Sequence, residues 1–165
     1  MKKLHFLILI MFTAFFSNVF TLSAQSSVDF GYTKPSVSGK RIIAPNFQAD
    51  KHFRNYFKRA INETWVEKED GYRVRFYEND IRFMVDYNKK GEWISTIKSY
   101  DETLLSKEIA NAVMTQFLGY SIVHVIEIHT KKVNLHLVKI ENKYLLKTVR
   151  VINGEMDVLE EYRKG

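Results

Sequence analysis

The sequence predicts an α+β protein in which two helices alternate with antiparallel strand meanders. Two segments, 46–62 and 107–118, carry apolar residues at helical spacing. Four strand-like runs separated by turn signals follow each of these segments. The order of one helix and four strands therefore occurs twice, which indicates a tandem repeat with halves at about 46–100 and 106–164. We expect both helices to pack on one face of the sheet.

Residues 1–24 have the features of a secretory signal peptide. Lys2 and Lys3 precede an apolar run, and the segment ends in mostly small residues. Cleavage is expected after Ala24, with Ser23 as the alternative site. An uncleaved membrane anchor is the competing interpretation, but the run is marginal for a bilayer span, which needs about 20 residues. We expect a periplasmic or secreted protein with no membrane span after cleavage.

The mature chain is expected to hold a flexible leader and one domain. Residues 25–45 show no apolar period and contain both prolines, whereas 46–165 is long enough for its own core. The chain has no cysteine, so its stability cannot depend on disulfides. Loss of Lys2 and Lys3 with the signal lowers the formal net charge from +6 to +4. Export and the lack of Lys/Arg clusters argue against a nucleic-acid partner.

The first half begins with a helix over 46–62, for which Asn46 is the expected N-cap. Its predicted apolar stripe consists of Phe53, Tyr56, Phe57, Ala60 and Ile61. Strands are expected over 64–68, 72–77, 81–87 and 92–98. Asp70-Gly71 is a hairpin signal between the first two strands.

The second half begins with a helix over 107–118, for which Ser106 is the expected cap. Strands are expected over 120–129, 133–140, 144–152 and 156–162, and Asn153-Gly154 is again a hairpin signal. An ungapped offset of 63 places Glu78-Asn79 on Glu141-Asn142, which weakly supports the repeat.

A family resemblance rests on aromatic and turn positions. The residues that carry it are the run Asp86-Tyr87-Asn88-Lys89-Lys90-Gly91-Glu92-Trp93-Ile94-Ser95-Thr96, together with Phe53, Phe57, Trp65, the segment 104–109 and the segment 120–122. This pattern resembles the PepSY-like family of beta-lactamase-inhibitor-like periplasmic proteins over residues 46–164. The family often has Pro where Ser106 stands, but Ser is a competent helix cap.

The resemblance implies a tandem helix and four-strand repeat, export and no enzymatic activity. It also implies a role in binding or inhibiting another envelope or secreted protein, such as a peptidase. No inhibitory residue set is shared, so beta-lactamase inhibition itself is not implied.

The sequence contains no catalytic motif that would identify an enzyme. It has no Gly-x-Ser-x-Gly elbow and no glycine-rich phosphate loop. An enzyme of unfamiliar type is therefore the least favoured hypothesis, and no cofactor is expected.

Glu127, His129 and His136 form the one metal-like combination. A tight turn at Lys131-Lys132 would place Glu127 opposite His136 on neighbouring strands. This defines the alternative function, a small-ligand or metal-binding periplasmic protein. We favour a solvated polar sheet face, because two lysines make a poor two-residue hairpin turn and repel a dication.

The favoured site is a protein-binding sheet face. Its candidate residues are Arg73, Arg75, Tyr77, Met84 and Trp93. Residue types such as Arg, Tyr and Met are enriched at protein interfaces. The side of the sheet occupied by Trp93 is ambiguous, and an ordinary solvated face is the competing interpretation. The expected partner is an envelope or secreted protein or peptide whose identity the sequence does not give.

Overall fold

The computed structural model describes residues 46–165. The expected signal peptide, its cleavage site and the leader over 25–45 lie outside the described residues. The helices and strands are, in chain order, α2 (Phe47–Tyr56), β1 (Ile61–Lys68), β2 (Gly71–Glu78), β3 (Ile81–Asn88), β4 (Trp93–Tyr100), η1 (Glu102–Leu104), α3 (Lys107–Gln116), β5 (Ser121–Thr130), β6 (Asn134–Glu141), β7 (Leu145–Ile152) and β8 (Glu155–Arg163).

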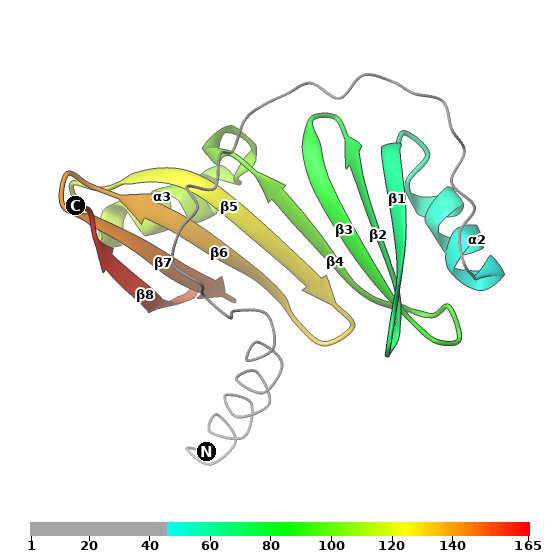
Figure 1. The fold of residues 1–165 in the computed structure, drawn as a ribbon. Helices are drawn as coiled ribbons and strands as arrows, with labels where there is room; N and C mark the ends of the chain where they lie inside the picture. Colours follow the sequence, from blue (N-terminus) through cyan, green and yellow to red (C-terminus); the bar gives the residue numbers. More distant parts are fainter. Residues whose placement is uncertain (1–45) are drawn as a thin grey trace, which may run out of the picture. The chain divides into compact units, whose positions relative to one another are not determined.

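The eight strands form one antiparallel sheet in which spatial order follows chain order (Figure 1). β1 and β8 are the two edge strands, and β4 pairs with β5 to join the two halves. The predicted α+β class and the order of one helix and four strands in each half are therefore confirmed. The short helix η1 between β4 and α3 was not predicted.

The strand register assigns both helices to the same face of the sheet. Residues directly opposite on antiparallel strands share a face, and Phe83 lies opposite Lys98, which lies opposite Glu127 and then His136. The apolar residues beneath α2 and those beneath α3 both belong to this face, which we call the helix side. The other face, which carries Arg75 and its alternating neighbours, is called the helix-free face.

An aromatic core fastens α2 to the helix side of the first half. Phe53 is fully buried, and its ring centroid lies 5.0 Å from that of Phe76 and 5.5 Å from that of Trp65. The predicted cap is confirmed, since the side chain of Asn46 accepts hydrogen bonds from the backbone N–H groups of Gln48 and Ala49.

The helix α2 ends earlier than the sequence predicted, and the predicted apolar stripe is wrong at two positions. Tyr56 is 71% exposed and Ile61, at the start of β1, is 49% exposed. The chain leaves the helix at Phe57, whose backbone has φ −117° and ψ 66°. This exit lets the Phe57 ring pack 4.8 Å from the Phe76 ring, so tertiary packing overrides the continued helical period.

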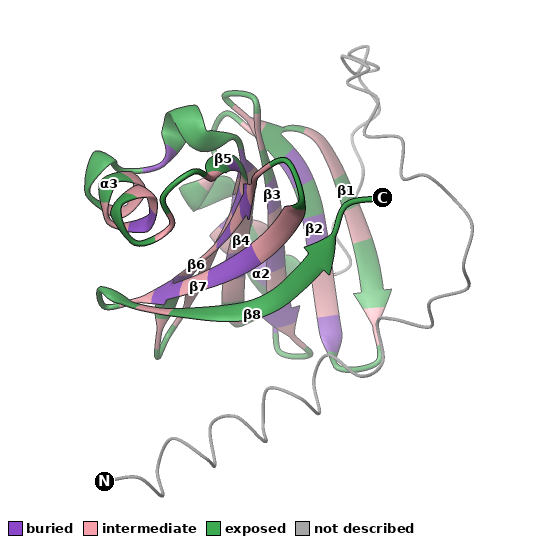
Figure 2. Ribbon diagram, turned by 90° about the vertical axis from the view of Figure 1, so that its left-hand side faces the viewer, coloured by how far each residue is buried: buried purple, intermediate pink, exposed green. Residues whose placement is uncertain are grey.

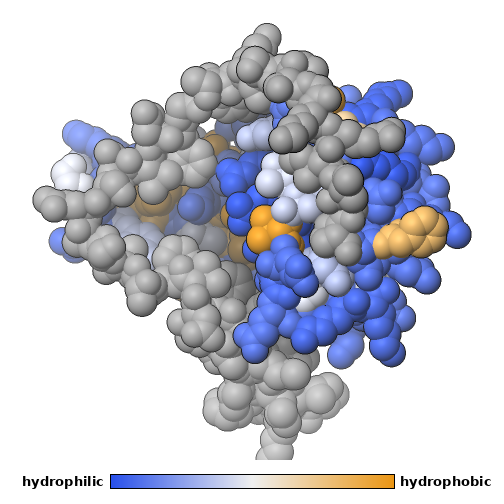
Figure 3. All heavy atoms as spheres, turned by 45° about the vertical axis from the view of Figure 1, so that its right-hand side comes forward, coloured by the Kyte–Doolittle hydropathy of each residue, from blue (hydrophilic) through white to orange (hydrophobic). Residues whose placement is uncertain are grey.

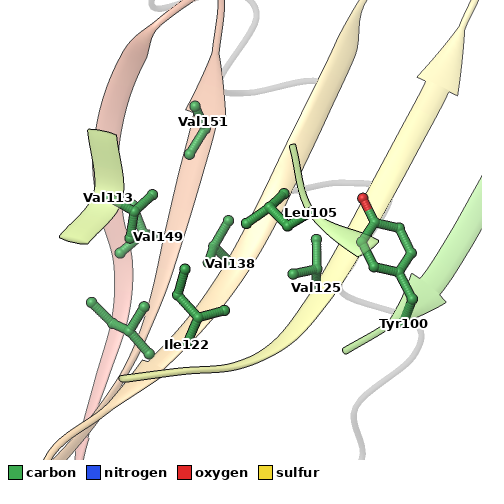
Figure 4. Close-up of a cluster of buried hydrophobic side chains, with 9 residues drawn as sticks. Tyr100, Leu105, Val113, Ile122, Val125, Val138, Val149 and Val151 are labelled. Carbon is green, nitrogen blue, oxygen red and sulfur yellow. The ribbon is translucent and has the colours of Figure 1, made fainter. Parts of the chain in front are cut away.

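A second, largely aliphatic core fastens α3 to the second half. Val113 packs with Val125, Val138 and Val149 on the helix side (Figure 4). Ser106 caps the helix as predicted, because its side chain accepts a hydrogen bond from the N–H of Ile109. The helix ends at Gln116, two residues before the expected end.

Two hairpins illustrate how turn chemistry sets the register. Asn153 and Gly154 both have positive φ, as the predicted two-residue turn requires. At the Asp70-Gly71 signal the turn residues are instead Glu69 and Asp70, and Gly71 begins β2. A Cβ on Gly71 would meet the carbonyl oxygen of Tyr87, so glycine allows β3 to approach closely.

Burial decreases toward the β8 edge of the sheet. Most residues of β8 are exposed, whereas β7 buries Val149 and Val151 (Figure 2). The sheet therefore ends at β8 with a solvent-facing strand.

Candidate functional site

The helix-free face brings together four of the five residues predicted for protein binding. Arg73, Arg75 and Tyr77 alternate along β2, and Met84 lies opposite Arg75 on β3. Alternation places all four side chains on one face, because successive strand residues point to opposite sides. The exposed members are Arg75 and Tyr77, and Met84 is half-buried.

Arg73 has a structural role within this group. Its Nε donates to Oδ1 of Asp86 at 2.7 Å, and its Nη2 donates to Oδ2 at 2.9 Å. The hydrogen bond that Arg73 donates to Asp86 outweighs desolvation and raises the pKa of Arg73 above its ordinary value. A bidentate pair of this kind fixes the side chain, so Arg73 is less available to a partner than Arg75.

Trp93 does not belong to this surface. The register shifts between Asp86 and Tyr87, and Trp93 lies opposite Tyr87 on the helix side. There it packs against the α2 core, and its Nε1 donates to Oγ1 of Thr96 at 2.9 Å. The predicted five-residue set therefore divides between the two faces, because one bulge reverses the direction of the side chain.

Apolar residues continue the helix-free face across the centre of the sheet. Met84 lies opposite Ile97, which lies opposite Ile128. Ile126 on β5 lies opposite Leu137 on β6 and extends this set. Sequence reasoning missed these four neighbours, because their contact depends on the pairing of β4 with β5 across the intervening helix.

The outer side of the domain that carries β1 and α2 is mainly hydrophilic in Figure 3, with hydrophobic residues scattered singly over the described part. Isolated exposed apolar residues are ordinary on protein surfaces and mark no site. The grouped apolar residues Met84, Ile97 and Ile128 instead lie at the middle of the sheet.

Glu127 is the centre of a polar cluster on the helix side, between the two apolar cores. Its carboxylate accepts hydrogen bonds from Nζ of Lys98 at 3.0 Å and from the hydroxyl of Tyr100 at 2.9 Å, and it also contacts the ring of His129. Burial alone would raise the pKa of Glu127, but the hydrogen bonds from His129, Lys98 and Tyr100 lower it to about 2.

The predicted register of the metal-like combination is confirmed, but the geometry does not support a metal centre. Glu127 lies opposite His136, and His129 lies opposite Asn134. Among residues 46–165 no group of three His, Cys, Asp or Glu side chains is placed to hold a metal ion. The carboxylate of Glu127 is already engaged by Lys98, whose charge disfavours a cation there.

The poor Lys131-Lys132 turn is replaced by a longer loop built on Thr130. The Thr130 hydroxyl accepts hydrogen bonds from the N–H groups of Lys132 and Val133 and donates to the Val133 carbonyl. A threonine-capped loop of this kind supplies the turn without positive φ at either lysine.

Two further histidines are half-buried structural residues. Nε2 of His124 lies 3.0 Å from Oγ of Ser99 on the helix-free face, and burial lowers the pKa of His124. Nδ1 of His52 lies 3.1 Å from the hydroxyl of Tyr87, a partner that the sequence did not reveal. Burial likewise lowers the pKa of His52.

Comparison with solved structures finds a similar fold in several proteins of Bacteroides. A BLIP-like protein from Bacteroides fragilis matches with a TM-score of 0.58 at 13% identity, covering 74% of this chain and 88% of that chain. A DUF2874 family protein from Bacteroides ovatus matches with a TM-score of 0.57 at 16% identity, covering 74% and 89%. A Bacteroides eggerthii chain described as "putative periplasmic proteins" matches with a TM-score of 0.57 at 14% identity, covering 73% and 89%.

These likenesses confirm, at the level of the fold, the resemblance inferred from the sequence. The chain has the fold of the DUF2874 and BLIP-like proteins. No protein-family model and no curated protein matches its sequence. Within residues 46–165 no helix is both long and apolar enough to cross a membrane.

Proposed function

We propose that this protein is a non-catalytic, exported binding module that docks a protein of the envelope or the secreted fraction on its helix-free face. Arg75, Tyr77 and Met84 lie side by side on this face, next to the apolar residues Ile97 and Ile128. An apolar centre flanked by arginine and tyrosine is the usual composition of an interface core.

The single observation that carries the proposal is the contrast between Arg73 and Arg75. Both project from the helix-free face of β2, and Arg73 is held by Asp86. Among residues 46–165, Arg75 has no carboxylate within 4.0 Å. A basic side chain that the domain does not use for its own stability is available to a partner.

The comparisons support the same class of function. One relative in fold is called BLIP-like and another is described as periplasmic. Carried to this chain, those descriptions favour export and an inhibitor-like role toward an envelope or secreted protein, peptidases included. The signal-peptide features of residues 1–24 agree with export.

Affinity capture tests this function. The full chain, carrying a C-terminal tag, is expressed in its own host, and the proteins it retains from envelope extract are identified by mass spectrometry. We expect one enriched envelope protein that untagged chain displaces. The double variant Arg75→Ala/Tyr77→Ala should retain at least ten-fold less of it, with an unchanged melting temperature.

A matched control removes an exposed basic and tyrosine pair elsewhere. Lys143 lies 5.3 Å from the Tyr144 ring centroid in the turn between β6 and β7. The variant Lys143→Ala/Tyr144→Ala should capture the partner as well as the wild type does. Equal capture by the Arg75→Ala/Tyr77→Ala variant would exclude the helix-free face as the docking surface.

A further inference from the structure

A shallow pocket opens at the β1–β3 end of the sheet. Its volume is about 350 Å³, and it is lined by Asn62, Thr64, Arg75, Phe76, Tyr77 and Arg82. The register places Thr64 opposite Arg75 and Tyr77 opposite Arg82, so these four side chains belong to the helix-free face. The pocket therefore lies beside Met84, within the proposed docking surface.

Two unneutralised guanidinium groups meet in this pocket. Arg75 and Arg82 are diagonal neighbours on β2 and β3, and both are exposed. In the part of the chain that the structure describes, neither has a carboxylate within 4.0 Å, whereas Arg73 and Arg150 are each paired with an aspartate. Two adjacent positive charges repel each other, and an anion placed between them removes that repulsion.

Asn62 adds an unused hydrogen-bond donor to the pocket lining. It lies in the β-bulge at the start of β1 and has φ +56°. Its Nδ2 is buried and has no hydrogen-bond partner within residues 46–165. Unsatisfied buried donors are rare in folded proteins and call for an acceptor. The terminal amide torsion of Asn is soft, so the amide can turn toward a ligand. The hydroxyl groups of Thr64 and Tyr77 complete the polar lining.

We propose that this pocket binds the carboxylate of an aspartate or glutamate side chain of the partner polypeptide. This inference rests on the proposed docking function and specifies the chemistry of the partner. A guanidinium fork matches the two oxygens of a carboxylate, and the amide and hydroxyl groups satisfy their remaining lone pairs. The apolar residues of this chain beyond Met84 would then contact apolar residues of the partner that flank its acidic residue.

Amide NMR shifts of the ¹⁵N-labelled full chain test the pocket with two matched probes, N-acetyl-glutamate amide and N-acetyl-glutamine amide. We expect the glutamate probe to cause saturable shifts at Thr64, Arg75 and Arg82, and the glutamine probe to cause none. Equal shifts from both probes, or no shift from the glutamate probe, would overturn the proposal. Binding of inorganic phosphate without binding of the glutamate probe would overturn it as well.

Charge-removing variants locate the site. Arg75→Gln and Arg82→Gln should each weaken binding of the glutamate probe about ten-fold while leaving the remaining spectrum unchanged. Arg150→Gln removes the same charge from a paired arginine on the same face, and it should bind the probe as the wild type does. Unchanged binding in both Arg75→Gln and Arg82→Gln would refute the assignment.

The alternative occupant is the carboxylate of Asp29, the one acidic residue among residues 1–45 of this chain. Tighter binding of the glutamate probe by Asp29→Asn would assign the pocket to the leader and overturn the partner assignment. Failure of the pocket is distinguishable from failure of the docking function. If capture depends on Arg75 and Tyr77 but the probe causes no shift, the docking surface is supported and carboxylate binding in the pocket is rejected.

Discussion

Tyr100 donates its phenolic hydrogen to Glu127 across the β4–β5 pair, with 2.9 Å between the oxygens. Tyr100 ends the last strand of the first half, and Glu127 lies in the first strand of the second half. Lys98 reaches the other oxygen of the same carboxylate at 3.0 Å. The junction between the halves is therefore fastened by side chains as well as by backbone hydrogen bonds.

Replacing Glu127 with Gln should destabilise the domain by about 1–3 kcal/mol, because charge-assisted hydrogen bonds are lost and Lys98 is left half-buried without its partner. Urea denaturation measures this free energy. Glu161→Gln is the control. Glu161 lies on the exposed strand β8, where it pairs with Lys147 of β7. That variant should change stability by less than about 0.5 kcal/mol.

The stabilisation by Glu127 also predicts a pH dependence. The pKa of Glu127 is lowered from its ordinary value of 4.5 to about 2 in the folded state. The stabilisation is therefore fully present above pH 4.5 and is lost as the pH falls from 4.5 toward 2. The difference in unfolding free energy between wild type and Glu127→Gln should shrink over this window, and a constant difference would contradict it.

Arg73→Ala should mainly lower stability, whereas Arg75→Ala should mainly weaken partner capture. Loss of Arg73 leaves Asp86 half-buried without its bidentate partner, which costs about 1–3 kcal/mol of stability. Loss of Arg75 should change stability by less than about 0.5 kcal/mol but weaken partner capture. Chemical denaturation and capture measured on both variants check this, and equal loss of stability would contradict it.

Gly91→Ala should destabilise the domain far more than Gly154→Ala. Both glycines have similar backbone torsions, φ +82° and φ +83°, so the backbone strain of alanine is the same. A Cβ on Gly91 would fall 2.8 Å from the backbone nitrogen of Ala49, whereas nothing lies within 4 Å of a Cβ on Gly154. We expect a loss above about 2 kcal/mol at Gly91 and about 1 kcal/mol at Gly154 in denaturation experiments. Equal losses would contradict packing of α2 on this turn.

Trp93→Phe should lower stability by about 1 kcal/mol without affecting partner capture, because Trp93 lies on the helix side and its indole donates to Thr96. Trp65→Phe is the matched control. Its Nε1 is buried and has no partner within the described residues, so the same truncation removes no hydrogen bond. A loss of capture in Trp93→Phe would show that Trp93 contributes to partner binding.

The strands and most turns were predictable, because period-two alternation and Asn-Gly pairs act over a few residues. The alternation of Val74 and Phe76 with Arg75 alone assigns the faces of β2. Simple alternation does not hold at bulges, where one extra residue reverses the face. The bulge beside Tyr87 places Trp93 on the helix side, and that beside His124 places Ile122 there.

The repeat alignment at an offset of 63 conflicts with the faces of the sheet. The offset of 63 carries the bounds of β2 onto those of β6. It would nevertheless place buried Phe76 on Lys139, which lies on the helix-free face. An offset of 64 places Phe76 on buried Ile140 and Val74 on buried Val138. Duplication stays a prediction, but its correct alignment must follow the faces.

The candidate site was only partly predictable. Arg73, Arg75, Tyr77 and Met84 share two adjacent strands, so local alternation was enough to group them. The pairing of β4 with β5 is long-range, and no local pattern reveals that Ile97 meets Ile128 or that Tyr100 reaches Glu127. The pocket depends on the bulge at Asn62, which the sequence period does not show.

The strand order leaves β1 and β8 as open edges, where another copy of the chain would have to pair. Pairing of β1 from a further copy with β8 would extend the sheet head to tail, as β5 extends it beyond β4, and repeated pairing would form a fibre. Four carboxylates along β8, from Glu155, Asp157, Glu160 and Glu161, oppose such growth, and Glu67 with the β1 bulge opposes it at the other edge. The charged edge strands therefore disfavour growth of the sheet beyond a single chain.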